Sequence, residues 1–265
     1  MLSSTQRERY SRHLQLPEIG EAGQARLAAA RVLVVGAGGL GSPAVMFLAA
    51  AGVGTLAVAD YDRVDLSNLQ RQLLFRTSDI GEDKVTAARA AVDALNPDVR
   101  VETIAWAMDG PDLVREVGRA DVVVDASDNF ETRFEVNAAS RATGTPLVSG
   151  AAIRMEGQVA VFDPKDPDSP CYRCLFDDTG DPDEPCARVG VFAPVAGITG
   201  TIQAAAAVKL VVGLPSGLEG RLMLIDALAM RVRTVRVRRD PACPACRGTP
   251  NGAGGDGRGG GAPAR

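Results

Sequence analysis

Aromatic residues and histidine are scarce in this sequence of 265 residues: Phe, Tyr and Trp together make up 4%, and His13 is the single histidine. The first shortage removes the stacking platforms that single-stranded nucleic acids need. The second argues against a histidine-rich metal site or a Ser-His-Asp triad. Basic residues are in no excess, because 29 Lys and Arg face 33 Asp and Glu, so we expect no nucleic-acid partner. The chemistry must come from carboxylates, cations, cysteines and backbone groups.

Neither a leader nor a membrane span is expected. The amino-terminal segment lacks the basic, apolar and small-residue succession of a signal peptide. The longest apolar stretch, Val195 to Val212, is interrupted by polar residues such as Gln203 and Lys209. With 46% hydrophobic and 23% charged residues, the composition is that of a cytoplasmic globular protein of one or two domains.

Short β-branched runs alternate with alanine-rich helical patterns from Arg31 onward. Gly41-Ser42-Pro43 opens one such helix and Gly52 closes it, and a second helix extends from about Asp83 to Asn96. This alternation predicts an α/β fold, a Rossmann-like nucleotide-binding sheet with helices on both faces. The predicted parallel strands are 32–35, 55–59, 99–103, 122–125 and 146–149.

The pattern changes after residue 149, where hairpin-like pieces predict an antiparallel extension of the same sheet. The pieces are 157–162, 221–225 and 230–237. The acidic, Gly- and Pro-rich stretch 177–185 is expected to be a mobile loop. We divide the chain into an N-terminal helical arm (1–30), a single main domain (31–247) and a disordered Gly-rich tail (248–265).

A glycine-rich loop, Gly36-Ala37-Gly38-Gly39-Leu40-Gly41, follows the first predicted strand and opens a helix. In that context the backbone can approach a phosphate at the helix N-terminus. Asp60 ends the second strand, about 20 residues further on, where a carboxylate can hold ribose hydroxyls. Both features fit a nicotinamide-dependent oxidoreductase equally well. Packing glycines and a turn-capping Asp60 are the simpler alternatives.

The connection after the second strand is long, and it carries polar groups from Ser67 to Arg71, with Lys84 following. Hydride transfer creates no new charge on a cofactor's diphosphate. Breaking a phosphoanhydride does, and fixed cations stabilise the charge on the departing pyrophosphate. Two cations near a glycine loop therefore favour ATP over NAD, although a solvated Arg or Lys is the ordinary alternative for each one singly.

Asp128-Asn129 follows the fourth predicted strand, at the edge where open α/β sheets bind ligands. Asp128 could hold Mg²⁺, which prefers one or two carboxylates together with substrate phosphates. It could also cap a helix, since Thr132 and Glu135 have the spacing of a capping box.

Four of the five cysteines form two C-x-x-C pairs, Cys171 with Cys174 and Cys243 with Cys246. This pattern is typical of a closed, structural zinc site that joins two distant hairpins, while a redox pair and inert thiols are the alternatives. Cys186 stands alone in the acidic stretch, as a free thiol or a nucleophile.

Taken together, the glycine loop, the Ser67–Arg71 segment, Lys84, Asp128-Asn129 and the four paired cysteines closely resemble the MoeB/ThiF/HesA family of sulfur-carrier adenylyltransferases, relatives of the ubiquitin-activating enzymes. The segments around Glu156 and Cys171-Tyr172-Arg173-Cys174 look most like the molybdopterin-synthase branch. The resemblance implies that ATP adenylates the C-terminal glycine of a small ubiquitin-like sulfur carrier ending in Gly-Gly, of molybdopterin or thiamine type.

The resemblance also implies roles for single residues. Asp60 would hold the ribose, Asn68, Arg71 and Lys84 the phosphates, and Asp128 the Mg²⁺. Arg12 would reach the nucleotide of the neighbouring subunit in a homodimer, and Cys186 aligns with the cysteine that links covalently to the carrier in other branches. The candidate catalytic residues are Arg71, Lys84, Asp128, Arg12 and Cys186, and the candidate nucleotide-binding residues are Gly36, Gly38, Gly39, Gly41, Asp60, Ser67, Asn68, Leu69, Gln70, Arg71, Lys84, Asp128 and Asn129.

Some relatives carry a rhodanese domain where this chain has its Gly-rich tail, so a separate protein is expected to donate the sulfur. Two other classes of function stay open on the sequence: the nicotinamide-dependent oxidoreductase with a zinc site, and an inactive scaffold that only binds the carrier.

Overall fold

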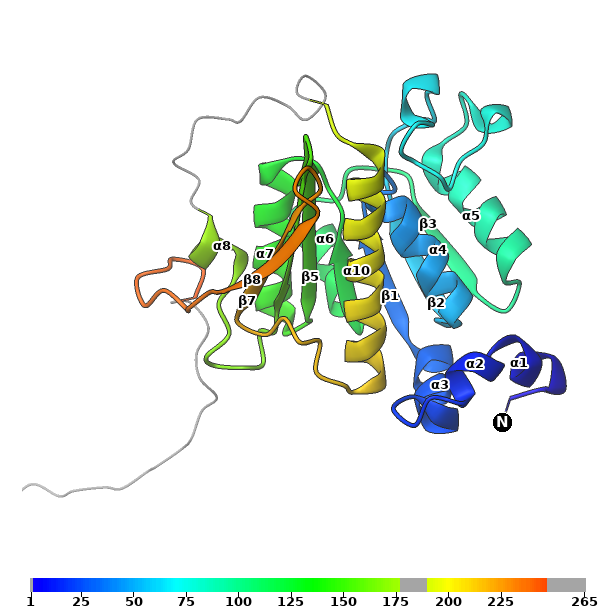
Figure 1. Ribbon diagram of the computed structural model, residues 1–265, viewed down its shortest axis with the longest axis horizontal. Coiled ribbons are helices and arrows are strands. Elements are labelled where there is room, and N and C mark those ends of the chain that lie inside the picture. Colours follow the sequence, from blue (N-terminus) through cyan, green and yellow to red (C-terminus); the bar gives the residue numbers. More distant parts are fainter. Residues whose placement is uncertain (1, 177–189, 247–265) are drawn as a thin grey trace, which may run out of the picture.

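The valine-rich runs of the sequence form one mixed sheet in the computed structural model, which describes residues 2–176 and 190–246 (Figure 1). Within these residues the sheet has 8 strands in the order β3-β2-β1-β4-β5-β6-β7-β8. The first five are parallel, and the last three continue antiparallel from β5, as predicted. The strands are β1 (Arg31–Val35), β2 (Thr55–Ala59), β3 (Arg100–Ile104), β4 (Val122–Asp125), β5 (Leu147–Ile153), β6 (Glu156–Phe162), β7 (Arg221–Asp226) and β8 (Arg231–Arg236).

Helices connect the parallel strands and cover both faces of the sheet (Figure 1). They are α1 (Ser4–Arg9), α2 (Ser11–Leu14), α3 (Gly20–Ala29), α4 (Gly41–Ala51), α5 (Lys84–Leu95), α6 (Gly110–Gly118), α7 (Phe130–Thr143), α8 (Tyr172–Leu175) and α10 (Ala193–Val212), with the 3₁₀ turns η1 (Leu66–Asn68) and η2 (Thr77–Asp79). The stretch 177–185 and the tail 248–265 lie outside the described residues.

The strand boundaries differ from prediction mainly at the hairpins. β2 and β4 begin and end where predicted, whereas β3 lies one residue later than 99–103. β5 continues past its predicted end at Ser149, because Gly150 to Ile153 pair with β6 across the first hairpin. Glycine and alanine have weak strand preference, so only the pairing partner makes this half of β5 a strand.

The parallel strands are buried on both faces because alternate side chains enter two separate cores. Val32 and Val34 of β1 pack in the core that α4, α5 and α10 cover. Leu33 and Val35 point the opposite way, into the core under α6 and α7. Continuous apolar runs, rather than alternating ones, are the sequence sign of such strands.

Helix α10 is long and apolar enough, with a mean hydropathy of 1.6, to pass a membrane-span test on length and composition alone. In the structure it lies across the sheet beside α4, and half of its most apolar window is buried (Figure 1). Its polar residues make contacts inside the fold: the Gln203 side-chain NH₂ group donates to the carbonyls of Asp125 (2.7 Å) and Val148 (3.2 Å). These contacts are those of a core helix.

The N-terminal helices α1 to α3 lie at the amino end of the sheet, where several longer helices end (Figure 1). Arg9 donates to the carbonyl of Leu95 at the end of α5 (2.8 Å), and Gln24 donates to that of Ala51 at the end of α4 (2.8 Å). Tyr10 is buried beneath Gly52, the left-handed residue that ends α4. The described part of the N-terminal arm, residues 2–30, therefore covers the C-termini of α4 and α5.

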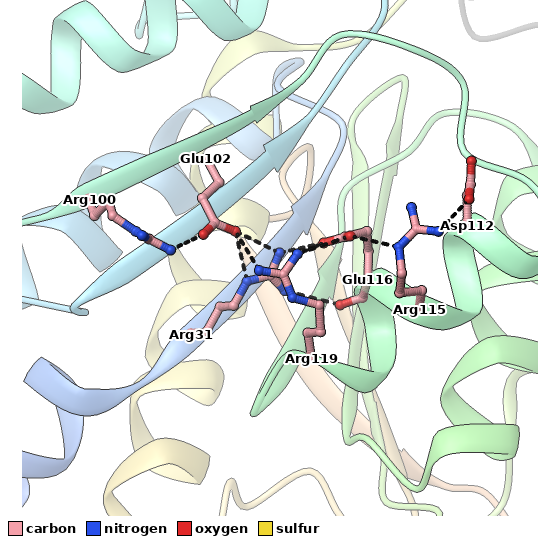
Figure 2. Close-up of polar contacts among 7 residues, drawn as sticks. All are labelled: Arg31, Arg100, Glu102, Asp112, Arg115, Glu116 and Arg119. Carbon is pink, nitrogen blue, oxygen red and sulfur yellow. Dashed lines mark hydrogen bonds and ion pairs between the residues drawn. The ribbon is translucent and has the colours of Figure 1, made fainter.

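A cluster of ion pairs, here called the amino-end network, joins β1, β3 and α6 at this same end of the sheet (Figure 2). Arg31 pairs with Glu102 (3.0 Å) and Glu116 (2.6 Å), and Glu116 also pairs with Arg119 (3.0 Å). Burial would raise the pKa of Glu116, but the hydrogen bond from Arg119 and the charge of Arg31 outweigh it, so the pKa is lowered. The members are Arg31, Arg100, Glu102, Asp112, Arg115, Glu116 and Arg119.

Candidate functional site

The candidate nucleotide-binding residues meet at the carboxyl ends of β2, β1 and β4, which are neighbours in the sheet. Gly36 follows β1, Asp60 follows β2, and Ala126 follows β4. Helices α4, α5 and α7 begin at this edge, so their N-terminal amides and positive dipole ends face the same region. The strand order thus assembles a polar site from segments that are far apart in the sequence.

Packing explains some glycines of the loop and leaves others for a ligand. Gly36 has φ of 90°, and a Cβ there would lie 2.8 Å from the Ala126 carbonyl oxygen. A Cβ on Gly41 would overlap the Gly36 carbonyl oxygen. At Gly38, however, φ is ordinary and the nearest atom to a built Cβ is 3.7 Å away, on Gln72. Gly38 is therefore not required by the fold, and its backbone is open to approach from outside.

Asp60 connects the end of β2 to the glycine loop. Its carboxylate accepts the amide of Ala37 (2.8 Å) and the amide of Asp62 (2.9 Å). Burial raises the pKa of Asp60, while the charge of Lys84 and the two amides oppose that rise. Asp60 therefore does hold a turn, as the simpler alternative proposed, and it does so beside the glycine loop. Its contact with a ribose stays a prediction.

Lys84 is not a solvated surface cation. It is the first residue of α5 and only 5% exposed. Its Nζ lies 2.7 Å from a carboxylate oxygen of Asp62 and 3.7 Å from one of Asp60. The sequence analysis missed Asp62 as a partner, although an acidic residue three positions after the end of a buried strand was a usable signal. The two carboxylates hold the ammonium group beside the loop.

Arg71 lies against the glycine loop from the other side. A Cβ on Gly39 would be 3.4 Å from Cγ of Arg71, and the guanidinium donates to the Ser67 carbonyl (3.1 Å). Within the described residues, no ion pair involves Arg71. The turn that carries it is stabilised locally, because Asp65 accepts the Ser67 amide (2.8 Å) and donates its own amide to Asn68 (3.3 Å). Among the carboxylates of residues 2–176 and 190–246, none therefore neutralises the positive charge of Arg71.

The other members of this segment are placed differently. The side chain of Leu69 packs against the hydrophobic core, so any contact with a nucleotide must come from its backbone. Gln70 and Ser67 are exposed, and Asn68 is half-buried. The neighbouring Gln72 is buried at 3% exposure with its amide facing Gly38, a residue that the sequence analysis did not single out.

Asp128 and Asn129 share the loop between β4 and α7. Asn129 is the N-cap of α7, and its side chain accepts the Thr132 amide (2.9 Å). The alternative of a cap at Asp128, with a capping-box spacing at Thr132 and Glu135, is therefore wrong, since Asn129 is the N-cap and the helix begins at Phe130. The cap is supplied by Asn129, and Asp128 is an exposed carboxylate of the kind that, alone or with a second one, binds Mg²⁺ together with substrate phosphates.

One candidate catalytic residue, Arg12, does not join this site. Arg12 is exposed in α2, near the C-termini of α4 and α5, whereas the site lies at their N-termini. The 11 residues of α4 alone separate these ends by about 16 Å. Arg12 therefore cannot reach the site of its own chain. Cys186 lies outside the described residues.

The four paired cysteines converge beside α8, and all four Sγ atoms lie within 4.8 Å of one another. The shorter separations are 3.7 Å for Cys171–Cys243, 3.6 Å for Cys174–Cys246 and 3.4 Å for Cys171–Cys246. A zinc ion with Zn–S bonds of about 2.3 Å places its four sulfurs about 3.8 Å apart. Disulfide bonds, at about 2.05 Å, are absent among the described cysteines. The geometry fits one tetrahedral cation.

The protein surroundings suit thiolates that share a cation. Burial raises the pKa of Cys171, and the neighbouring sulfurs raise it further, so the four thiolates would repel one another without a compensating charge. The Asp240 amide donates to Cys174 (3.4 Å), a typical outer contact of a metal-bound sulfur. We call the two C-x-x-C segments, 171–174 and 243–246, the cysteine knuckle.

Comparison with known sequences gives consistent relatives. A family model described as the ThiF family matches residues 10–245. The chain is 47% identical to the SAMP-activating enzyme E1 of Haloferax volcanii, over 92% of this chain and 90% of that protein. It is 44% identical to the sulfur carrier protein ThiS adenylyltransferase of Escherichia coli (91% and 95%) and 40% identical to the molybdopterin-synthase adenylyltransferase of the same organism (92% and 98%).

Solved structures agree on the fold. Escherichia coli MccB crystallised with ATP superposes with a TM-score of 0.79 at 23% identity, over 92% of this chain and 75% of that one. At this identity the likeness concerns the fold alone. The family model spans both the glycine loop and the first three knuckle cysteines, and the relatives match nearly end to end. The chain therefore belongs to the ThiF family.

Proposed function

We propose that this protein uses ATP to adenylate the C-terminal glycine of a small ubiquitin-like sulfur carrier that ends in Gly-Gly. The observation that carries the proposal is the position of two cations at the glycine loop: Arg71 against Gly39, and Lys84 held by Asp60 and Asp62. Relatives at 40–47% identity are named adenylyltransferases of sulfur carriers or a SAMP-activating enzyme, which supports this substrate class.

In the proposed reaction, a carboxylate oxygen of the carrier's last glycine attacks the α-phosphorus of ATP. The bond from that phosphorus to the oxygen bridging to the β-phosphate breaks, which gives an acyl-adenylate and pyrophosphate. The attacking carboxylate is already ionised at neutral pH, so no general base is needed. Negative charge develops on the departing pyrophosphate, and this is the charge that Arg71 and Lys84 stabilise.

The remaining site residues bind and orient the nucleotide. Backbone amides at Gly38 and Gly39 approach the phosphates, with Asn68 nearby, and Asp60 accepts the ribose hydroxyls. Asp128 provides the carboxylate for Mg²⁺, which would supply further neutralisation of the phosphate oxygens. Because Lys84 is paired before ATP arrives, we expect it to exchange part of its contact with Asp62 for a phosphate oxygen.

The knuckle is proposed to hold one Zn²⁺ through Cys171, Cys174, Cys243 and Cys246. Four thiolates leave no open coordination position, so the metal would be structural and would take no part in adenylation. It would tie the segment after β6 to the segment after β8.

Further parts of the proposal concern partners. A homodimer would place Arg12 of one subunit at the nucleotide of the other, which is the only way for Arg12 to act, given its distance from the site in its own chain. A separate sulfur donor in the cytoplasm would attack the acyl-adenylate and displace AMP. Cys186 is a candidate for a later covalent link to the carrier, and adenylation itself does not require it.

The decisive experiment is ATP–pyrophosphate exchange in the presence of Mg²⁺, with a panel of small Gly-Gly-ending carriers from the same organism. Exchange with one intact carrier, and none with the same carrier lacking its last glycine, is the expected result. Silence across the panel from folded, zinc-loaded protein would contradict the proposal. NAD binding tighter than ATP binding would instead favour the oxidoreductase, an alternative to which none of the relatives named above lends support.

A further inference from the structure

A buried polar cluster lies directly behind Asp128. Asp125, the last residue of β4, is fully buried, and its carboxylate accepts the amide (3.1 Å) and the hydroxyl (2.6 Å) of Ser127. The hydroxyl of Ser149 on β5 is 3.4 Å from the other carboxylate oxygen. A carboxylate at the end of an all-valine strand costs free energy to bury, so its retention needs a reason.

Arg133 completes the cluster from the first turns of α7. It is 7% exposed, and its guanidinium donates to the carbonyl of Ser127 (2.8 Å). Ser127 is therefore held at its amide and hydroxyl by Asp125, and at its carbonyl by Arg133. Both contacts act on the residue that immediately precedes Asp128.

The backbone before Ser127 is equally constrained. Gln203 of α10 donates to the Asp125 carbonyl (2.7 Å), and the amide of Ala126 donates to the Val35 carbonyl (2.8 Å). On the other side of Asp128, the Asn129 cap holds the start of α7 (2.9 Å to the Thr132 amide). Asp128 thus projects from a segment whose neighbours are fixed on both sides.

Helix stability alone does not explain this arrangement, because Asn129 already caps α7. An apolar pair of similar volume would fill the space of Asp125 and Arg133 at lower desolvation cost. Arg133 Nε, moreover, has no hydrogen-bond partner within the described residues. Such groups are commonly retained where a contact residue must be held in one geometry.

We infer that Arg133, acting with Asp125 through Ser127, is a positioning residue that holds Asp128 for Mg²⁺–ATP. This inference rests on the proposed function, since it assigns Asp128 to the metal. Arg133 itself touches neither nucleotide nor metal. Its loss should therefore weaken the Mg²⁺-dependent part of ATP binding and leave the Mg²⁺-independent part unchanged.

The test compares Arg133→Met with Arg133→Lys in two measurements: isothermal titration calorimetry of ATP, with and without Mg²⁺, and the Mg²⁺ dependence of ATP–pyrophosphate exchange. For Arg133→Met we expect the Mg²⁺ concentration for half-maximal exchange to rise about 10-fold and the exchange rate to fall about 10- to 100-fold. The ATP affinity measured in EDTA should be unchanged. Arg133→Lys should restore part of the loss. Ser127→Ala, which removes only the 2.6 Å hydrogen bond to Asp125, should shift Mg²⁺ dependence in the same direction by a smaller factor, about 3-fold.

Arg31→Met is the matched control, because it removes a part-buried arginine from the opposite end of the same sheet. It should lower the melting temperature and leave the Mg²⁺ dependence as in the wild type. Wild-type Mg²⁺ dependence in folded Arg133→Met and Ser127→Ala would overturn the inference, as would an equal shift in Arg31→Met. If the wild type exchanges with no carrier, the proposed function fails. The ATP titrations would still decide whether Arg133 acts on the metal-dependent step.

Discussion

The two ends of the parallel sheet both carry clustered charges, yet they use them differently. At the amino end, Arg31 pairs with Glu102 and Glu116, and Glu116 pairs with Arg119, so each buried charge has an opposite neighbour (Figure 2). At the carboxyl end, Lys84 is paired, but Arg71 makes no ion pair within the described residues. One cluster is complete by itself, and the other leaves positive charge available to a phosphate.

The pKa shifts of the carboxylates differ between the two ends in the same way. The pKa of Glu116 is lowered, because Arg119 and Arg31 outweigh the effect of burial. The pKa values of Asp60 and Asp125 are raised, because burial outweighs the charge of Lys84 in the first and that of Arg133 in the second. Compensated charge stabilises a fold, whereas buried charge with incomplete compensation is typical of binding sites.

The largest effect is expected from Arg71→Ala, which removes the uncompensated cation. We predict a fall in ATP–pyrophosphate exchange of about 100- to 1,000-fold, the range seen when one charge-stabilising donor is lost. The melting temperature should change little, because Arg71 makes no ion pair among the described residues.

The control for Arg71 is Arg89→Ala, which removes a positive charge from the exposed side of α5, where Arg89 donates to the Thr103 hydroxyl (2.8 Å). It should retain wild-type exchange. Comparable losses in both variants would mean that net charge, rather than the position of Arg71, matters.

Removal of the knuckle metal is expected to have the next largest effect, and we expect this effect at the carboxyl end of the sheet. The Tyr172 amide donates to Asn137 of α7 (2.9 Å), one turn beyond Arg133, so the knuckle supports the helix behind Asp128. Chelation, or Cys171→Ser with Cys243→Ser, should lower the melting temperature by about 10 °C or more and reduce exchange as well.

Metal analysis of protein purified without chelator checks the premise, with about one zinc per chain expected. Fewer than about 0.5 equivalents, with the four thiols reactive, would reject the zinc site.

Arg31→Met tests the amino end. It removes one partner of Glu102 and of Glu116, which keep their contacts with Arg100 and Arg119, and we expect unfolding free energy to fall by roughly 2–4 kcal/mol, somewhat less than for a fully buried pair. Exchange per folded molecule should stay at the wild-type rate, as measured by denaturant unfolding and exchange on the same preparation. Arg115→Met, in a pair that is half exposed, should lose much less unfolding free energy than Arg31→Met, because solvent screens an exposed pair. Equal losses in the two variants would show that Arg31 is no special centre of the network.

The smallest effect concerns pH. Because the folded pKa of Glu116 lies below its ordinary value, its stabilisation is fully present above about pH 4.5 and is lost as the pH falls through the folded pKa. The stability difference between wild type and Glu116→Gln should therefore shrink between pH 5 and the folded pKa.

Asp60→Asn should behave in the opposite way. The folded pKa of Asp60 is raised, so acidification protonates its buried carboxylate in the folded wild type. The unfolding free energy of the wild type should therefore rise relative to that of Asp60→Asn as the pH falls. Denaturant titrations at a series of pH values measure both trends. Parallel trends in the two variants would contradict the distinction between the two ends.

Local patterns determined much of this protein. The continuous apolar runs predicted the parallel sheet, because a strand buried on both faces has no polar side. Gly36 and Gly41 marked the strand-to-helix turn, because each lies where a Cβ would meet the backbone of the loop or of the β4 end. The C-x-x-C pairs indicated the knuckle, because each pair is a short loop that already directs two sulfurs to one point.

Only the tertiary structure decided which charges meet. Asp62 and Lys84 contact one another because strands end at a common edge and helices begin there, and no sequence period records such contacts. The same holds for Arg12, whose place at the far end of α4 follows from the packing of α2 and α3 against helix C-termini. Backbone geometry is set by neighbours in sequence. The burial and pairing of charges are set by neighbours in space, and these differ between the two ends of one sheet.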